Sequence, residues 1–354
     1  RSNHHSGHDC RSLWNRRVCR GSKRTVRSFS GGLKVLVSRQ TLASVIEKLA
    51  KAKYLASDTE TTSLRPFHDG RLFSIAMAAE IDGAITAAYF NFQPYEGLAE
   101  EFVLDRVTTC QLLQEKIYSN PAITHVFFNA KFDEHMLKNE GIEIVGQVRC
   151  AMVHGKLIYN EHQSYSLDAS LTRIGLAKDD KVMAYIKDHD LHTWENIPGK
   201  KTRSKNLHFD RVPIDLVAPY AIADSTGTLK LGMHQLKQIK ILDSEIPDES
   251  KKLARVVENE IRLNRTIHRL EQHGCLIDTP YCIDAIAKED TRLKAIQAQF
   301  EVLTGVPFID SAKIFQHVFA TDQLHWGVSE TGLPAFDSDA LEKFQNPAAR
   351  VVLY

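Results

Sequence analysis

The sequence has no long hydrophobic run, few cysteines and almost no net charge. None of its apolar stretches reaches the 18 residues that a membrane helix requires, and no secretory signal precedes the rest, so we expect no membrane span. Its six cysteines show no CxxC spacing. That argues against a zinc ribbon and against a disulfide framework, and it fits a reducing cytoplasm.

The net charge of +1 conceals an asymmetry along the chain. Residues 1–30 hold eight Lys or Arg and one Asp, a balance of +7, so the remaining chain carries about −6. A mildly acidic folded part is not typical of a protein that coats DNA passively. It fits an acidic metal-binding cleft with local basic rims better.

Residues 1–32 are polar and basic without periodicity, which predicts a disordered tail. The tail contains His4, His5, His8 and Cys10, which could bind a metal, but a flexible tail is favoured because nothing around them would fix a geometry. The chain also begins with Arg, so we expect it to be a portion of a longer protein.

Residues 33–245 alternate between apolar, β-branched runs and amphipathic runs, which predicts a mixed sheet with helices on both faces. We expect strands at 34–37, 54–57, 71–79, 84–91 and 123–128, and helices at 40–52, 106–119, 131–140, 151–159 and 214–240. The dipeptide Asp82-Gly83 is typical of a tight hairpin.

Two further segments are distinguished by composition. Residues 187–213 are polar, and we expect a mobile loop that is either simply solvated or a basic rim contacting phosphates. Beyond Pro247, helical spacing at 251–273 and a scarcity of strand patterns predict a helical region over 246–354, one that ends before it forms a compact domain.

Three acidic groups could carry chemistry. Asp58 and Glu60 lie two residues apart at a predicted strand end, so their carboxylates project to one face. Asp133 lies in the first turn of a predicted helix, and Tyr220 and Asp224 share one helix face. Each group taken alone is common in a purely structural role. Paired carboxylates such as Asp58 and Glu60, however, commonly bind a divalent cation.

Taken together, in this order, the three groups resemble the motifs of the DnaQ-like exonucleases. Asp58-Thr59-Glu60 matches the first motif, Asn129-Ala-Lys-Phe-Asp133 the second and Tyr220-Ala-Ile-Ala-Asp224 the third. The resemblance implies an α/β fold with an RNase H-like mixed sheet flanked by helices. It also implies 3′→5′ exonuclease activity with two divalent cations, Mg²⁺ or Mn²⁺, bound by Asp58, Glu60, Asp133 and Asp224.

The tyrosine indicates the DEDDy branch, since Pro219 occupies the position where other members have histidine. The resemblance implies that the Tyr220 hydroxyl orients the attacking water, and that Asp58, Glu60, Asp133, Tyr220 and Asp224 form the catalytic set. Deprotonation of that water is assigned to the metal, since a free phenol is a poor base at neutral pH.

Finer similarity points to the proofreading domains of family A, polymerase I type, DNA polymerases. There the leucine matching Leu64 wedges against the terminal bases, and Thr59 and Asn129 are implied to contact substrate. Cys150-Ala151-Met152 departs from an Asp-Thr-Met frequent in that family. Further similarity lies at 164–171 and 258–278, and in two segments that resemble the start of a polymerase thumb, 308–313 and 331–339.

The resemblance implies a monomer in the cytoplasm of a bacterial or phage-infected cell. Its partners would be single-stranded or frayed DNA 3′ ends and a downstream polymerase domain of the same longer chain; no palm or fingers motif is recognisable. An RNase D-like exoribonuclease shares the tyrosine-type motifs and is the nearest alternative. A catalytically inactive scaffold that holds DNA is a third.

Overall fold

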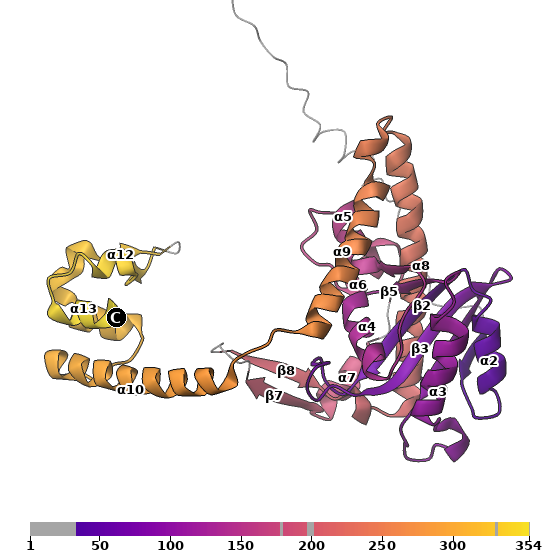
Figure 1. Ribbon diagram of the computed structural model, residues 1–354, viewed down its shortest axis with the longest axis horizontal. Coiled ribbons are helices and arrows are strands. Elements are labelled where there is room, and N and C mark those ends of the chain that lie inside the picture. The colour runs from indigo at the N-terminus through magenta and orange to yellow at the C-terminus, as the bar shows by residue number, and fades with distance from the viewer. Residues whose placement is uncertain (1–32, 178–179, 197–201, 330–331, 354) are drawn as a thin grey trace, which may run out of the picture. The chain divides into compact units, whose positions relative to one another are not determined.

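The computed structural model describes residues 33–177, 180–196, 202–329 and 332–353, and these form two compact units that divide between His273 and Gly274. The basic tail predicted over 1–32 lies outside the described residues. The first unit contains all the acidic motifs (Figure 1).

A six-stranded mixed sheet forms the centre of the first unit (Figure 1). Its order is β1 (Leu33–Leu36), β4 (Ala84–Asn91), β3 (Leu72–Ile81), β2 (Tyr54–Thr61), β5 (Thr124–Phe127) and β6 (Val148–Cys150). β2, β3 and β4 are antiparallel neighbours, and the outer strands pair in parallel. The expected mixed sheet is confirmed.

The hairpin between β3 and β4 explains part of this order. Asp82 and Gly83 both have positive φ, 52° and 75°, as a two-residue hairpin turn with right-handed strand twist requires. β3 is buried along nearly its whole length, which its continuous apolar sequence Leu-Phe-Ser-Ile-Ala-Met-Ala-Ala allows. A strand covered on both faces must lie inside the sheet, between two helical layers.

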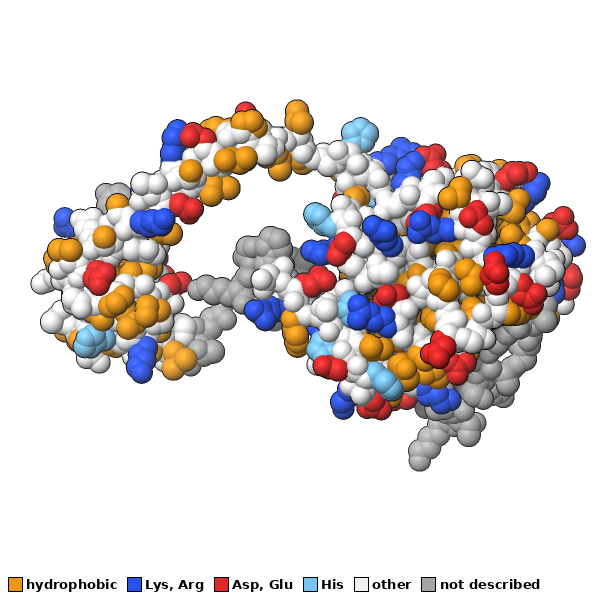
Figure 2. Space-filling model, turned by 90° about the horizontal axis from the view of Figure 1, so that it is seen from below, with side chains coloured by type: hydrophobic (Ala, Val, Ile, Leu, Met, Phe, Trp, Pro, Cys, Tyr) orange, Lys and Arg blue, Asp and Glu red, His pale blue; other side chains and the backbone are white. Residues whose placement is uncertain are grey.

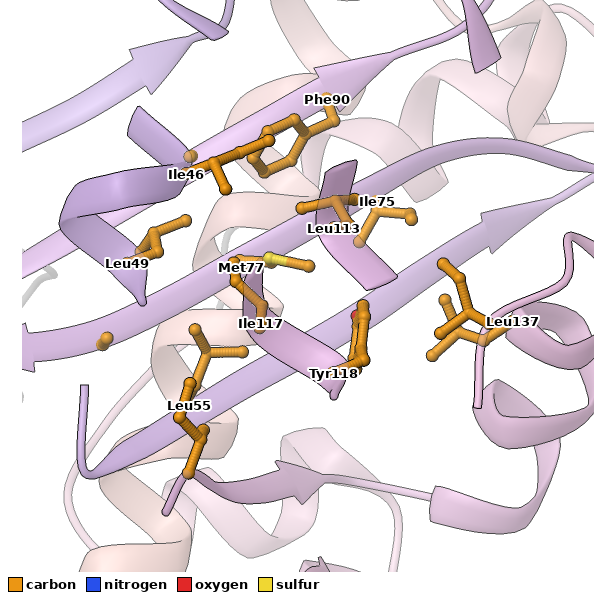
Figure 3. Packing of buried hydrophobic residues seen from close by; sticks show 14 of the residues in the cluster. Ile46, Leu49, Leu55, Ile75, Met77, Phe90, Leu113, Ile117, Tyr118 and Leu137 are labelled. Atoms are coloured by element: carbon orange, nitrogen blue, oxygen red, sulfur yellow. The ribbon is translucent and has the colours of Figure 1, made fainter. Parts of the chain in front are cut away.

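Each face of the sheet is covered by helices. On one face lie α2 (Leu42–Leu49), α3 (Arg106–Leu113), the π-helical turn η2 (Gln114–Tyr118) and α4 (Ala130–Asn139). Figure 3 shows their side chains, among them Leu49, Leu113 and Ile117, packed toward Leu55 and Met77 of the sheet. The other face is covered by α7 (Lys181–Asp188) and the long helix α8 (Ile214–Ser244).

Three helices complete the first unit: α5 (Ala151–Ile158), α6 (Leu167–Arg173) and α9 (Leu253–His273). The exonuclease region is predicted to end at residue 245, and the compact unit that contains it extends to His273, because α9 packs against α4, α5 and α8. The short 3₁₀ turns η1 (Glu100–Phe102) and η4 (Glu249–Lys251) lie in connections.

The mobile loop expected over 187–213 is wrong for the residues that are described. After α7, strands β7 (His192–Asn196) and β8 (Arg203–Leu207) pair as an antiparallel hairpin, followed by the turn η3 (Phe209–Arg211). The hairpin is a sheet of its own (Figure 1). Its strands escaped prediction because they lack a continuous apolar face, which is the usual strand signal.

The second unit is mainly helical, as expected, but the expectation that it ends before it forms a compact domain is wrong, because it has a hydrophobic core of its own. It contains α10 (Thr279–Thr304), α11 (Ala312–Val318), η5 (Ala320–His325), α12 (Ser338–Leu341), α13 (Pro347–Leu353) and the two-residue strands β9 (Gly327–Val328) and β10 (Pro334–Ala335). An aromatic cluster of Phe300, Phe315, Phe319 and Phe344 forms its core. No helix in the described part of the chain is long and apolar enough to cross a membrane.

The buried histidines predict how stability depends on pH. Burial lowers the pKa of His125, on β5, to about 4, and neither ring nitrogen has a hydrogen-bond partner among the described residues. An unfolded histidine titrates near 6.5. The folded state therefore binds the proton more weakly, so the stability contribution is complete above pH ~6.5 and is lost as the pH falls toward 4.

His125→Leu should remove this dependence. When the pH falls from 7 to 4.5, the unfolding free energy of the variant should decrease by about 2–3 kcal/mol less than that of wild type. The variant lacks the histidine whose pKa is lower in the folded than in the unfolded state. Urea denaturation at both pH values measures the change. Parallel pH profiles for the two proteins would contradict a neutral, buried His125.

Candidate active site

The acidic motifs meet where β2 extends past its neighbour β5. Pairing between these strands ends at Ala56 opposite Val126, whereas β2 continues to Thr61. The last residues of β2 therefore have a strand, β3, on one side only. On the other side of β2, where β5 has ended, side chains from other elements can approach the strand.

Asp133 of α4 occupies this side of β2. One carboxylate oxygen, Oδ1, accepts hydrogen bonds from the backbone N–H of Thr59 (3.0 Å) and from its hydroxyl (2.7 Å). Burial raises the pKa of Asp133 to about 7, against the opposing effect of these two hydrogen bonds. Thr59, predicted to contact substrate, thus also fixes the carboxylate of the second motif.

Asp58 and Glu60 lie on the opposite side of the strand from this arrangement. They share the face of β2 that carries Ala56, and Ala56 packs in the core that α8 covers. α8 carries Tyr220 and Asp224, so strand alternation and one helix bring the first and third motifs together.

The electrostatics of Tyr220 agree with this placement. Burial, and after it the negative charges of Asp224, Glu60, Asp58 and Asp168, raise the pKa of the phenol far above its ordinary value. At neutral pH the hydroxyl is therefore protonated. It can donate a hydrogen bond to an oxygen atom, and it is unsuited to act as a base.

Asp168 is the residue of this site that the sequence did not single out. It lies in the first turn of α6, whose N-cap is Ser166. The sequence signal for Asp168 is its place in the 164–171 segment, which is similar to a segment of the family. Cys150, at the departure from the family pattern, is buried, and its thiol donates to the Phe128 carbonyl (3.2 Å).

The chemistry of the four predicted ligands fits a hard divalent cation. They offer carboxylate oxygens, and three of them are nearly buried: Glu60 is 8% exposed, Asp133 5% and Asp224 6%. Within the residues that the structure describes, no three His, Cys, Asp or Glu side chains form a ready metal-binding group. The ligand set therefore stays a prediction.

The two other predicted substrate contacts are accessible. Leu64, in the loop between β2 and β3, is 75% exposed. Asn129 is exposed at the N-cap of α4, and its side chain makes no capping hydrogen bond. On the face shown in Figure 2, acidic and basic side chains are interspersed over the first unit. Basic side chains therefore form no continuous patch on the face of the first unit that Figure 2 shows.

The helix that carries Asp133 is fixed from behind by α9. Glu271 of α9 forms an ion pair with Lys131 (2.6 Å) and accepts a hydrogen bond from Nε2 of His135 (2.7 Å). Gln272 donates to Nδ1 of the same ring (2.7 Å), which places the imidazole proton on Nε2. Lys131 and His135 flank Asp133 by two residues on each side, so these contacts hold that turn of α4.

An α/β sheet with acidic groups at a strand end is compatible with a metal-dependent nuclease, and comparison with known proteins defines the class. Residues 35–239, more than half of the chain, match the 3′-5′ exonuclease family found in family A DNA polymerases. The chain belongs to this family, and the predicted 3′→5′ exonuclease domain is confirmed.

Among curated relatives, DNA polymerase DpoZ of Vibrio phage phiVC8 is 28% identical over 333 residues, which cover 86% of this chain and 47% of the relative. DNA polymerase I of Pseudomonas aeruginosa is 28% identical over 265 residues, covering 74% of this chain and 26% of the relative. The chain thus spans about half of these relatives or less.

A solved structure supports the fold. The polymerase domain of Pol1 from M. smegmatis, solved with a DNA primer-template and dNTP, aligns with 92% of this chain and 47% of its own, with a TM-score of 0.60 and 16% identity. The RNase H-like sheet followed by a helical region is confirmed as the fold class.

Replacing Glu271 should test the attachment of α4 to α9. His135 is buried, so Glu271→Ala leaves its Nε2–H without an acceptor and should cost about 1–3 kcal/mol of unfolding free energy. Glu271→Gln keeps an acceptor and should recover most of the loss, since the half-exposed pair with Lys131 contributes little. Equal stability of the two variants, measured by urea denaturation, would contradict this account.

Proposed function

We propose that this chain hydrolyses phosphodiester bonds at DNA 3′ ends and proofreads for a family A DNA polymerase domain of the same longer chain. The observation that carries the proposal is that α8, which bears Tyr220 and Asp224, packs against the face of β2 that bears Asp58 and Glu60, within a segment that matches the 3′-5′ exonuclease family. The phage and bacterial DNA polymerases among the relatives support DNA as substrate and a bacterial or phage-infected cell as the setting.

Asp58, Glu60, Asp133 and Asp224 are the residues that we propose to bind two divalent cations, Mg²⁺ or Mn²⁺. Such a pair of cations stabilises both the attacking and the leaving oxygen of an in-line displacement at phosphorus. The protein's own contribution is to hold the carboxylates in place. Thr59 fixes Asp133 through two hydrogen bonds, and β2 fixes Asp58 and Glu60 on one face.

Tyr220 orients the attacking water in this proposal. Its hydroxyl stays protonated in the surrounding negative field, so it donates a hydrogen bond to an oxygen and takes no proton. Removal of the hydroxyl should therefore slow hydrolysis without abolishing it.

Substitutions in the site test this function directly. Asp58→Asn or Asp224→Asn should abolish nucleotide release and leave stability equal or higher, since like charges are relieved. Tyr220→Phe should slow hydrolysis by roughly ten- to a thousandfold. Single-turnover release from a 3′-labelled oligonucleotide at saturating Mg²⁺ measures each rate, and thermal unfolding checks the fold.

Wild-type rates in the aspartate variants would remove these residues from the mechanism. Parallel assays on DNA and RNA of one sequence test the RNase D-like alternative, which requires the RNA to be cut faster. A wild-type chain that binds DNA and releases nothing would support the inactive scaffold.

Frayed ends should be cut faster than paired ends. The reactive strand must leave the duplex to reach carboxylates that are nearly buried on β2, α4 and α8. Each lost base-pair step costs about 1.4 kcal/mol. Melting two or three pairs lowers the reactive population roughly a hundredfold or more. Terminal mismatches have already lost part of this stability, so selectivity arises without reading base identity.

The exposed Leu64 is proposed to separate the terminal bases. Leu64→Ala should slow release from paired primer–templates while single-stranded DNA is cut at the wild-type rate. Labels on both ends follow the polarity. Equal wild-type rates on matched and mismatched ends would refute the melting argument, and earlier release of the 5′ label would contradict 3′→5′ action.

A further inference from the structure

The β7–β8 hairpin has two chemically different faces. Residues directly opposite each other in an antiparallel pair lie on the same face, and faces alternate along each strand. The register pairs Trp194 with Lys205 and Asn196 with Arg203 on one face. Glu195 with Ser204, and Thr193 with Asn206, lie on the other.

The second face is attached to the protein. The side-chain amide of Asn206 donates to the carbonyl of Thr62 (3.3 Å), and Glu195 forms an ion pair with Arg65 (3.5 Å). Both partners belong to the loop that continues β2 beyond Glu60 and that also carries Leu64. The hairpin is thereby held next to the strand that bears the first acidic motif.

The first face also carries the pair His192 and Leu207, whose end packs toward the protein, and from Trp194 onward it is turned to solvent. Trp194 is 58% exposed, and Asn196, Arg203 and Lys205 are exposed as well. Glu195, the acidic residue of the two strands, lies on the attached face, so this surface combines an indole with two cations and no acid. An exposed aromatic ring beside Arg and Lys is the combination with which proteins bind single-stranded nucleic acid, by base stacking and phosphate contacts.

We propose that this face, defined by Trp194, Arg203 and Lys205, binds the single-stranded segment of DNA that leads to the 3′ end in the active site. Trp194 stacks on a base, and the two cations contact phosphates. The inference rests on the proposed function for its substrate. Charge complementarity and the attachment to the Leu64 loop identify a DNA strand as the occupant.

Binding can be measured without catalysis. Anisotropy of a 5′-fluorescein dT₁₂ oligonucleotide, with the full chain in EDTA, reports affinity while no nucleotide is released. Trp194→Ala should weaken binding about tenfold, the scale of one base stacked on an aromatic ring, and Trp194→Phe should restore most of it. The double variant Arg203→Ala/Lys205→Ala should lower the slope of log affinity against log salt by about 1.4, for two phosphates of a single strand.

Matched controls come from the attached face and from substrate length. Ser204→Ala and Thr193→Ala change the same hairpin on its other face and should bind like wild type. With Mg²⁺, the KM for dT₁₂ should rise in the Trp194 and cation variants while kcat is unchanged. Hydrolysis of a dinucleotide, which has no strand leading to its scissile bond, should change far less than hydrolysis of dT₁₂.

The outcomes separate this inference from the proposed function. Wild-type affinity and salt slope in both Trp194→Ala and the double variant would overturn the hairpin surface even if the chain is an active exonuclease. Equal losses on dT₁₂ and on the dinucleotide would overturn it too, because the damage would then lie in the site. A chain that binds dT₁₂ through this face and cleaves nothing would uphold the surface and refute the exonuclease proposal.

Discussion

Burial of like charges is the constraint on which the rest of this structure depends. Glu60, Asp133 and Asp224 are nearly buried, and their repulsion in a medium of low dielectric opposes folding. A site of this kind requires a rigid support whose stability comes from elsewhere. The sheet provides it, because β3 is enclosed by two hydrophobic layers and β2 lies directly beside it.

The same arrangement explains why the carboxylates come from three separate elements. Alternation along β2 turns Asp58 and Glu60 toward α8, while the early end of β5 lets Asp133 reach the strand from α4 on the other side. No single helix or strand carries all four carboxylates of the proposed ligand set, so the set depends on the packing of β2, α4 and α8. α9 then secures α4 through Glu271, so a helix far along the chain contributes to the geometry of the second motif.

Much of this was predictable from the sequence. Apolar runs predicted five of the six strands of the sheet, and β6 was missed because it is short and contains Arg149. Asp82-Gly83 indicated the hairpin, and the spacing of the acidic motifs indicated the family. The contacts between elements were not predictable. The amphipathic pattern of α9 indicates a helix with one apolar face but not the partner of that face, so the inclusion of α9 in the first compact unit, which extends to His273, was not predicted.

The hairpin β7–β8 was missed for a different reason, which concerns function. Strand prediction relies on a face that is buried, and here one face is attached by polar contacts to the Thr62–Arg65 segment while the other carries Trp194, Arg203 and Lys205 in solvent. Those residue types do little for folding at exposed positions. The exposed Trp194, Arg203 and Lys205 are not explained by packing, which fits the proposal that they bind a nucleic-acid strand.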